Sequence, residues 1–296
     1  PDLPEAHYAV AQAAIPANRL DDPRSATDQA LVLRPSFEAA AVLKSQFLQR
    51  DSLTGAMAYL EGFLAANPKA RDARLMYARM LAAAKRPADA RREFEAVERD
   101  MPQNAEVAVM IGLLALQLQD LDAAETRLKR ALDLQYRDPD TLRFYLGQIA
   151  EERHRDADAL VWYAQVQAGD QVVAAAVRYS MILARQDKVD DARNYLRNVQ
   201  TQNPQQQILL VQAEAQVLRE AKRYTEAFDL LTAELEAHPA QPALLYDLAM
   251  IAERLDRLDV LEARLKQLIA IKPDHAQAYN ALGYTLADRN LRLDQA

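Results

Sequence analysis

The chain has 296 residues, of which 50% are hydrophobic and only 6 are glycine, so the composition predicts an all-α fold with a large buried surface. The formal net charge of −7 disfavours a nucleic-acid partner, because an acidic protein repels phosphate groups. Cysteine is absent, which excludes disulfide bonds, cysteine-type zinc sites and thiol catalysis within this chain.

Residues 1–36 form the least regular part of the sequence and are predicted to be a degenerate N-terminal repeat. The segment PEAHYAVAQAA predicts a first helix. The segment IPANRLDDP is rich in proline and aspartate and predicts a turn. The segment RSATDQALVL then predicts a second helix that ends at Pro35.

The rest of the chain repeats itself at intervals of 33 to 35 residues. Small residues that open every second predicted helix carry this period, with one leucine among them: Ala56, Ala90, Ala124, Ala159, Ala192, Ala227, Leu261 and Ala296. Prolines are predicted to close the repeats at the same period: Pro35, Pro68, Pro102, Pro204, Pro239 and Pro273.

This period defines the predicted domain organisation. Residues 37–275 are predicted to form seven full repeats in one continuous solenoid, and residues 276–296 a truncated final repeat. The full repeats are 37–70, 71–104, 105–139, 140–172, 173–207, 208–241 and 242–275. Each repeat has two helices, A and B, with large apolar residues at i, i+3 and i+4 spacing on one face.

Motifs that would indicate catalysis are absent from the sequence. It has no glycine-rich phosphate loop, no nucleophile elbow and no zinc-protease helix motif. The 4 histidines are far apart, and we interpret them as solvated turn residues rather than metal ligands. The longest apolar run, Val107–Leu116, is too short to span a bilayer. We therefore predict no catalytic residue, no metal site and no cofactor.

The repeats resemble the tetratricopeptide repeat family, whose first helix carries a W-x2-L-G-x2-Y pattern on a period of about 34 residues. Tyr279, Leu282, Gly283 and Leu286 have the spacing of that helix, and Ala296 falls where the second helix would begin. The resemblance covers nearly the whole chain and implies a right-handed superhelix of helix-turn-helix units. It departs from the family pattern at Leu261 and in residues 140–172, which lack the terminal proline.

The resemblance also implies that the A helices line a concave groove that binds protein. The predicted groove residues are Leu75, Arg79, Leu113, Phe144, Val177, Met181, Tyr246, Met250 and Tyr284. Arg185, Arg219 and Arg254 are expected at the edge of this groove. The alternative is that superhelical curvature buries these residues against adjacent repeats. The groove lacks the lysine and asparagine set with which chaperone-binding members hold a terminal carboxylate.

Two short segments, RPSFEAAAVLKSQFL and YNALGYTLADRNLRLDQA, resemble proteobacterial envelope lipoproteins built from these repeats. That resemblance implies an adaptor for a carboxyl-terminal processing protease, on the periplasmic face of the outer membrane. It also implies a signal peptide and a lipidated cysteine upstream of this chain as the contact with the membrane. An assembly factor for a secretion, pilus or cell-wall machine is the alternative, and the oligomeric state stays open.

Overall fold

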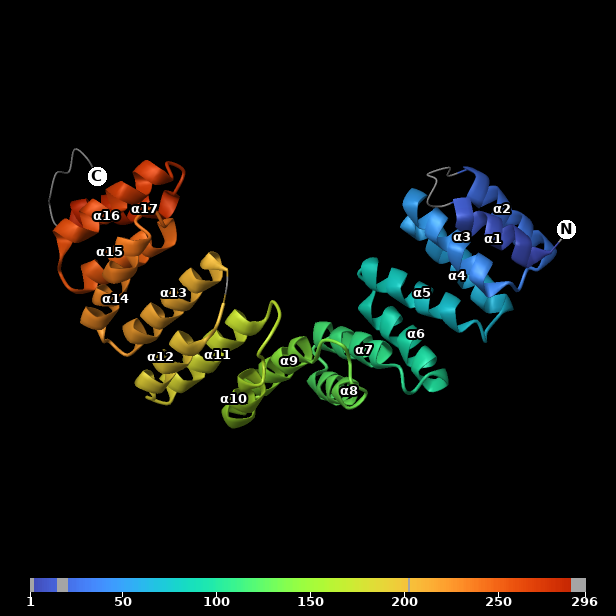
Figure 1. Ribbon diagram of the computed structural model, residues 1–296, viewed down its shortest axis with the longest axis horizontal. Coiled ribbons are helices and arrows are strands. Elements are labelled where there is room, and N and C mark those ends of the chain that lie inside the picture. The colour runs from blue at the N-terminus through green and yellow to red at the C-terminus, as the bar shows by residue number, and fades with distance from the viewer. Residues whose placement is uncertain (1–2, 15–20, 202, 289–296) are drawn as a thin grey trace. The chain divides into compact units, whose positions relative to one another are not determined.

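The computed structural model describes residues 3–14, 21–201 and 203–288, and within them the chain forms helices without strands (Figure 1). The first eight helices are α1 (Pro4–Ala14), α2 (Asp21–Leu33), α3 (Glu38–Asp51), α4 (Leu53–Ala66), α5 (Arg71–Ala83), α6 (Pro87–Asp100), α7 (Ala105–Gln117) and α8 (Leu121–Asp133). The others are α9 (Pro139–Glu152), α10 (Asp156–Ala164), α11 (Val172–Arg185), α12 (Val189–Asn198), α13 (Pro204–Glu220), α14 (Tyr224–Ala237), α15 (Pro242–Arg254), α16 (Leu258–Ile271) and α17 (Ala276–Asp288). The predicted all-α class is therefore confirmed. None of the described helices combines the length and apolar character needed to cross a bilayer.

Contacts within the chain separate it into two compact units, residues 1–142 and 143–296, which divide within α9. In the first unit α1 packs on α2, α3 on α4, α5 on α6 and α7 on α8. In the second unit α11 packs on α12, α13 on α14 and α15 on α16. Each pair is a helical hairpin. In the first unit α2 also contacts α3, α4 contacts α5 and α6 contacts α7, and in the second unit α12 contacts α13 and α14 contacts α15.

Some of the first helices of successive hairpins also contact one another directly. In the first unit α3 contacts α5, and in the second unit α11 contacts α13 and α13 contacts α15. Within each unit the A helices therefore form a layer of their own, as stacked repeats require in order to bury their apolar faces. We call the surface of this layer the A face.

The recurring small residues lie at the closest points of the hairpins. Ala56, Ala90, Ala124, Ala159, Ala192 and Ala227 are completely buried, and Leu261 is 1% exposed. Gly112 of α7 faces this interface, because a Cβ added there would lie 2.9 Å from a methyl carbon of Leu128 in α8. The sequence period thus marks the helix-to-helix contacts that hold each repeat together.

The turns between helices A and B share a left-handed backbone conformation that is not evident from the sequence. One residue in each of six turns has a positive φ between 56° and 62°, although none is glycine: Lys85, Gln119, His154, Asp187, Lys222 and Asp256. In each turn the next residue donates its amide to a carbonyl five positions earlier, as Asp120 does to Ala115 at 2.9 Å. This hydrogen bond satisfies a carbonyl at the end of helix A and fixes the reversal of the chain.

Replacing one of these left-handed residues with glycine should stabilise the protein. We expect Gln119→Gly to raise the free energy of unfolding by about 0.5–1 kcal/mol, because a residue with a Cβ is strained at positive φ and glycine is not. Urea unfolding followed by circular dichroism measures the change. Glu61→Gly is the control, since Glu61 is exposed within α4 and the change there should cost about 1 kcal/mol. Equal losses at both positions would contradict a special role for the turn.

Prolines differ in their positions from one repeat to another. Pro35, Pro68, Pro102, Pro239 and Pro273 each lie two residues after a helix ends, as predicted. Pro204 was predicted to close a repeat, and this is wrong, because it is the first residue of α13. Proline suits that position since it has no amide hydrogen to leave unpaired there. The helix-B start predicted at Ala296 and most of the turn predicted at 15–23 lie outside the described residues.

Candidate protein-binding surface

Two of the nine predicted groove residues, Leu75 and Arg79 of α5, meet at a cavity in the first unit. The cavity has a volume of about 220 Å³, and Val107 and Met110 of α7 line it with them. Leu75 is partly buried, and the side chain of Arg79 is 50% exposed. An apolar floor with an accessible charge at its edge is typical of sites that bind protein side chains.

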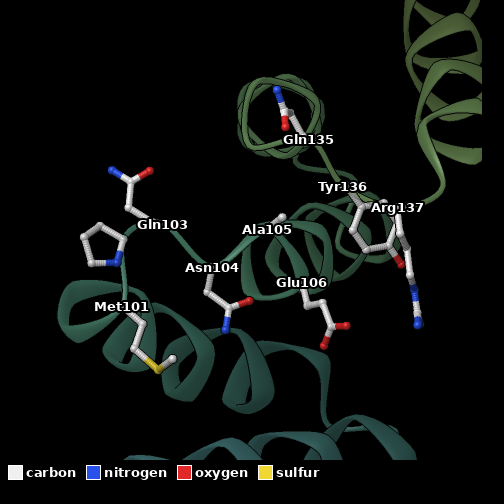
Figure 2. Close-up of a pocket in the computed structure, with 9 residues that line it drawn as sticks. Met101, Gln103, Asn104, Ala105, Glu106, Gln135, Tyr136 and Arg137 are labelled. Carbon is white, nitrogen blue, oxygen red and sulfur yellow. The ribbon is translucent and has the colours of Figure 1, made fainter.

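A larger open pocket of about 560 Å³ adjoins this cavity and shares Asn104, Glu106, Tyr136 and Arg137 with it. Two turns line the pocket: the α6–α7 turn contributes Met101 to Asn104, and the α8–α9 turn contributes Gln135 to Arg137. In Figure 2 the side chains of Asn104, Glu106 and Arg137 project the same way. The accessible surface thus continues from the A face to the turns between repeats.

Charged and polar groups at this surface are only partly occupied by internal contacts. The guanidinium of Arg79 lies 3.8 Å from a carboxylate oxygen of Glu106, which is a loose ion pair. The Asn104 side chain accepts a hydrogen bond from the Val107 amide at 3.2 Å and so caps α7. Arg137 is exposed. A partner that brings both apolar and polar groups would match these neighbours.

Sequence reasoning missed Tyr136 and Arg137, because it looked for groove residues only on the A helices. The turn that places them is recognised by its backbone in the structure, not by a sequence motif. Gln135 adopts a φ of 56°, and the Tyr136 amide then donates to the Ala131 carbonyl at 3.1 Å. The turn is therefore built like those between helices A and B.

Leu113, another predicted groove residue, is partly buried on α7 and lines neither cavity.

In the second unit the groove residues on α11 and α15 are partly buried on the A face. Val177 and Met181 of α11, with Tyr246 and Met250 of α15, pack against the main core of that unit while keeping accessible surface. The Tyr246 ring lies 5.6 Å from the ring of His275. Tyr284 of α17 is 69% exposed.

Phe144 differs from the other groove residues because it belongs to the core. It is only 7% exposed, and its ring centre lies 6.0 Å from that of the completely buried Tyr163. Its expected accessibility in the groove is therefore wrong, and the aromatic contact that covers it comes from its own repeat. The repeat that contains it has a short helix B, α10, so its aromatic side chains fill the hairpin instead.

Of the three arginines expected at the groove edge, Arg185 is held by contacts within the protein. Arg185 is held by Glu151, with contacts of 3.2 and 3.3 Å, and lies 3.7 Å from Asp156. The same Glu151 accepts hydrogen bonds from Arg178 at 3.1 Å and from the Tyr163 hydroxyl at 3.0 Å. Arg185 of α11 therefore forms an ion pair with Glu151 of α9, and this contact occupies its guanidinium.

In the part of the chain that the structure describes, no three His, Cys, Asp or Glu residues come together as metal ligands would. His238 and His275 lie at helix ends, where the ring Nδ1 of His275 accepts a hydrogen bond from the Ala278 amide at 3.2 Å. What the A face offers is partly buried apolar surface with polar groups beside it.

Two family models, both described as tetratricopeptide repeat, match this sequence. One matches residues 47–108, and the other matches residues 109–173 and 180–242. The TPR repeat-containing protein PA4667 of Pseudomonas aeruginosa is 36% identical over 134 residues. That alignment covers 45% of this chain and 23% of the relative, so the aligned part spans less than a quarter of that protein.

Solved structures with the same fold are less similar in sequence. The C-terminal part of a TPR repeat-containing protein from Cytophaga hutchinsonii superposes with a TM-score of 0.55 at 16% identity, covering 75% of this chain and 91% of that one. PilW, described as a widely conserved type IV pilus biogenesis factor, superposes with a TM-score of 0.51 at 16% identity, covering 70% of this chain and 98% of that one. The family models together match more than half of the sequence. The chain therefore belongs to the tetratricopeptide repeat family.

Proposed function

We propose that this chain is a non-catalytic scaffold that binds protein partners through its A face. The proposal rests on partly buried apolar side chains on the A face of each unit: Leu75 in the first, and Met181, Tyr246 and Met250 in the second. Tetratricopeptide repeats typically serve as interaction scaffolds, and their stacked helices offer an extended surface to a partner. Aromatic and methionine side chains are suited to anchor an extended segment or a helix.

The more specific proposal is an adaptor at the periplasmic face of the outer membrane, which brings protein substrates to a carboxyl-terminal processing protease. Support comes from the likeness of residues 34–48 and 279–296 to envelope lipoproteins. A second candidate is an assembly factor for an envelope machine, favoured by the shared fold with a pilus biogenesis factor.

An affinity experiment separates these two candidates. The full-length protein, tagged and purified from an envelope extract, is analysed by mass spectrometry for the proteins bound to it. Enrichment of a carboxyl-terminal processing protease, followed by faster degradation of a substrate when this protein is added, would support the adaptor. Enrichment of pilus, secretion or cell-wall components without a protease would support the assembly factor.

Charged substitutions on the A face should weaken binding without unfolding the protein. We expect Tyr246→Glu with Met250→Glu to lower partner affinity by about 30-fold, because an interface anchor is worth about 2 kcal/mol. Both side chains keep accessible surface, so the helical circular dichroism signal should be unchanged. Val161→Glu is the matched control, since Val161 is 59% exposed on the B helix α10.

Phe144→Glu tests whether Phe144 belongs to the core rather than to the binding surface. Because Phe144 is buried, its replacement by glutamate should lower the melting temperature whether or not a partner binds. A cooperative loss of helical signal in the Tyr246 and Met250 variant would instead show that those residues are also core. That outcome would remove the main support for the A face as the binding surface.

A further inference from the structure

A small polar cavity lies on the A face of the second unit, between α13 and α15. Its volume is about 110 Å³. The lining residues are Gln212, Ala215, Gln216, Arg219, Leu231, Asp247 and Ile251. The apolar members, Ala215, Leu231 and Ile251, are all at most 4% exposed, so the walls of the cavity are part of the hydrophobic core.

The two glutamine side chains are oriented by their neighbours. Gln212 donates from Nε2 to Oδ2 of Asp247 at 2.6 Å, and Gln216 donates from Nε2 to Oε1 of Glu220 at 3.0 Å. Each amide nitrogen donates one of its two hydrogens in this way, and the carbonyl oxygen of each side chain stays available as an acceptor. The carboxylate of Asp247 also has acceptor capacity beyond its one bond from Gln212.

We infer that this cavity binds a primary ammonium group on an alkyl chain, such as the end of a lysine side chain. An ammonium has three hydrogen-bond donors and no acceptor, which matches Asp247 and the two glutamine carbonyls. The methylene groups behind the ammonium would contact Leu231 and Ile251, as the stems of lysines do on apolar surfaces. A guanidinium fits less well, because its planar fork suits a bidentate carboxylate, and one oxygen of Asp247 already accepts from Gln212.

The ionised carboxylate of Asp247 lowers the stability of the folded protein, so stability does not explain its presence, and a role in binding does. Burial is the main cause that raises the pKa of Asp247, while the Gln212 hydrogen bond and the charge of Arg219 oppose the increase. Since its folded-state pKa lies above its unfolded-state pKa, the ionised carboxylate destabilises the folded protein at neutral pH. Asp247→Asn should therefore not lower the melting temperature at pH 7.

Arg219 is the group that competes with the ligand. It lines the cavity and is exposed, yet no ion pair within 4.0 Å joins it to Asp247 among the described residues. Its positive charge would repel an incoming ammonium. Arg219→Gln is expected to strengthen ammonium binding, whereas Asp247→Asn is expected to weaken it.

The first test uses n-pentylamine as the probe and does not depend on a protein partner. The full chain, with labelled isoleucine methyl groups, is titrated in phosphate buffer with n-pentylamine or with 1-pentanol, and the Ile251 methyl signal is followed by NMR. We expect saturable binding of the amine, with the alcohol and the Asp247→Asn variant each weaker by about tenfold or more, because charge-assisted hydrogen bonds are the strong ones. Asp259→Asn is the control, since Asp259 is exposed on α16. Equal binding of amine and alcohol, or no effect of Asp247→Asn, would overturn the inference.

The second test asks whether the ammonium belongs to a polypeptide, and it rests on the proposed function. An array of extended peptides that carry lysine, acetyl-lysine or arginine at one position is probed with wild-type protein and Asp247→Asn. A preference for lysine that the variant loses would assign the cavity to a protein ligand. Amine binding without that preference would assign it to a free alkylamine.

Failures of the two proposals are distinguishable. If peptides with lysine and with acetyl-lysine bound equally, and the amine did not bind, the ammonium site would be wrong. The proposal of a protein-binding scaffold would still stand. Binding of pentylamine with no peptide bound at all would leave the cavity and count against the A face as a peptide site.

Discussion

Gly147→Ala is expected to destabilise the second unit by about 2 kcal/mol or more, although it adds a single methyl group. A Cβ at Gly147 would lie 2.6 Å from Cδ1 of Tyr163, well inside van der Waals contact. Tyr163 cannot retreat easily, because it is completely buried and its hydroxyl is bonded to Glu151 at 3.0 Å. The clash must therefore be relieved by moving α9 away from α10.

Gly62→Ala is the matched control, because Gly62 is also in a helix, α4, but a Cβ there would have no neighbour within 4 Å. That substitution should stabilise the protein by about 0.5–1 kcal/mol, since alanine loses less conformational entropy in a helix. Thermal and urea unfolding of both variants gives the comparison. If the two alanines changed stability equally, close packing at Gly147 would not be what requires a glycine.

Glu214→Ala is the second substitution with a large expected effect, at roughly 3 kcal/mol of lost stability. Glu214 is only 3% exposed on α13. Its carboxylate accepts from Nε of Arg193 at 3.0 Å and from Nε of Arg197 at 3.0 Å, both on α12. The side chain of Arg193 is itself only 14% exposed, so loss of the carboxylate would leave a poorly solvated charge behind.

Arg193 keeps a second partner, which limits the loss. Its guanidinium donates to Glu226 of α14 at 2.7 Å, and Glu226 is also held by Arg223. The network thus joins three consecutive helices through charges rather than apolar contacts. Hydrogen exchange should show that Glu214→Ala loosens α12 to α14 more than the first unit.

Asp158→Ala provides the control for that experiment. Its ion pair with Arg155 is 3.4 Å long, and the two side chains are 56% and 37% exposed. Surface pairs of this kind are worth at most about 1 kcal/mol, so the variant should remain near wild-type stability. A loss for Glu214→Ala no larger than for Asp158→Ala would show that burial of the network contributes little.

The fold could be predicted because the same residue types recur in the sequence at a fixed period. Recurring alanines mark where helix B approaches helix A, and a side chain larger than a methyl group would overpack that contact. Ala90 and Ala124 are completely buried in agreement with this. The all-α class and the helix-turn-helix organisation follow from such local spacing, which needs no knowledge of the neighbouring repeat.

The groove was predicted only in part, because accessibility on the A face depends on which side chains of other helices pack against it. Helical spacing places Phe144 and Tyr246 at equivalent positions, yet Phe144 is 7% exposed and Tyr246 keeps accessible surface. The difference comes from Tyr163, which packs against Phe144 from the short helix α10. A pattern within one helix cannot show this contact.

By itself the sequence determined the fold class and the repeat period, since helical spacing is local and the small residues recur every 33 to 35 positions. Tertiary structure alone decided which charges meet. Glu214 is bonded to arginines 17 and 21 residues away, and Asp247 to a glutamine 35 residues away. Such pairs form because stacking brings successive repeats together, and that juxtaposition decides whether a polar side chain is core, surface or binding site.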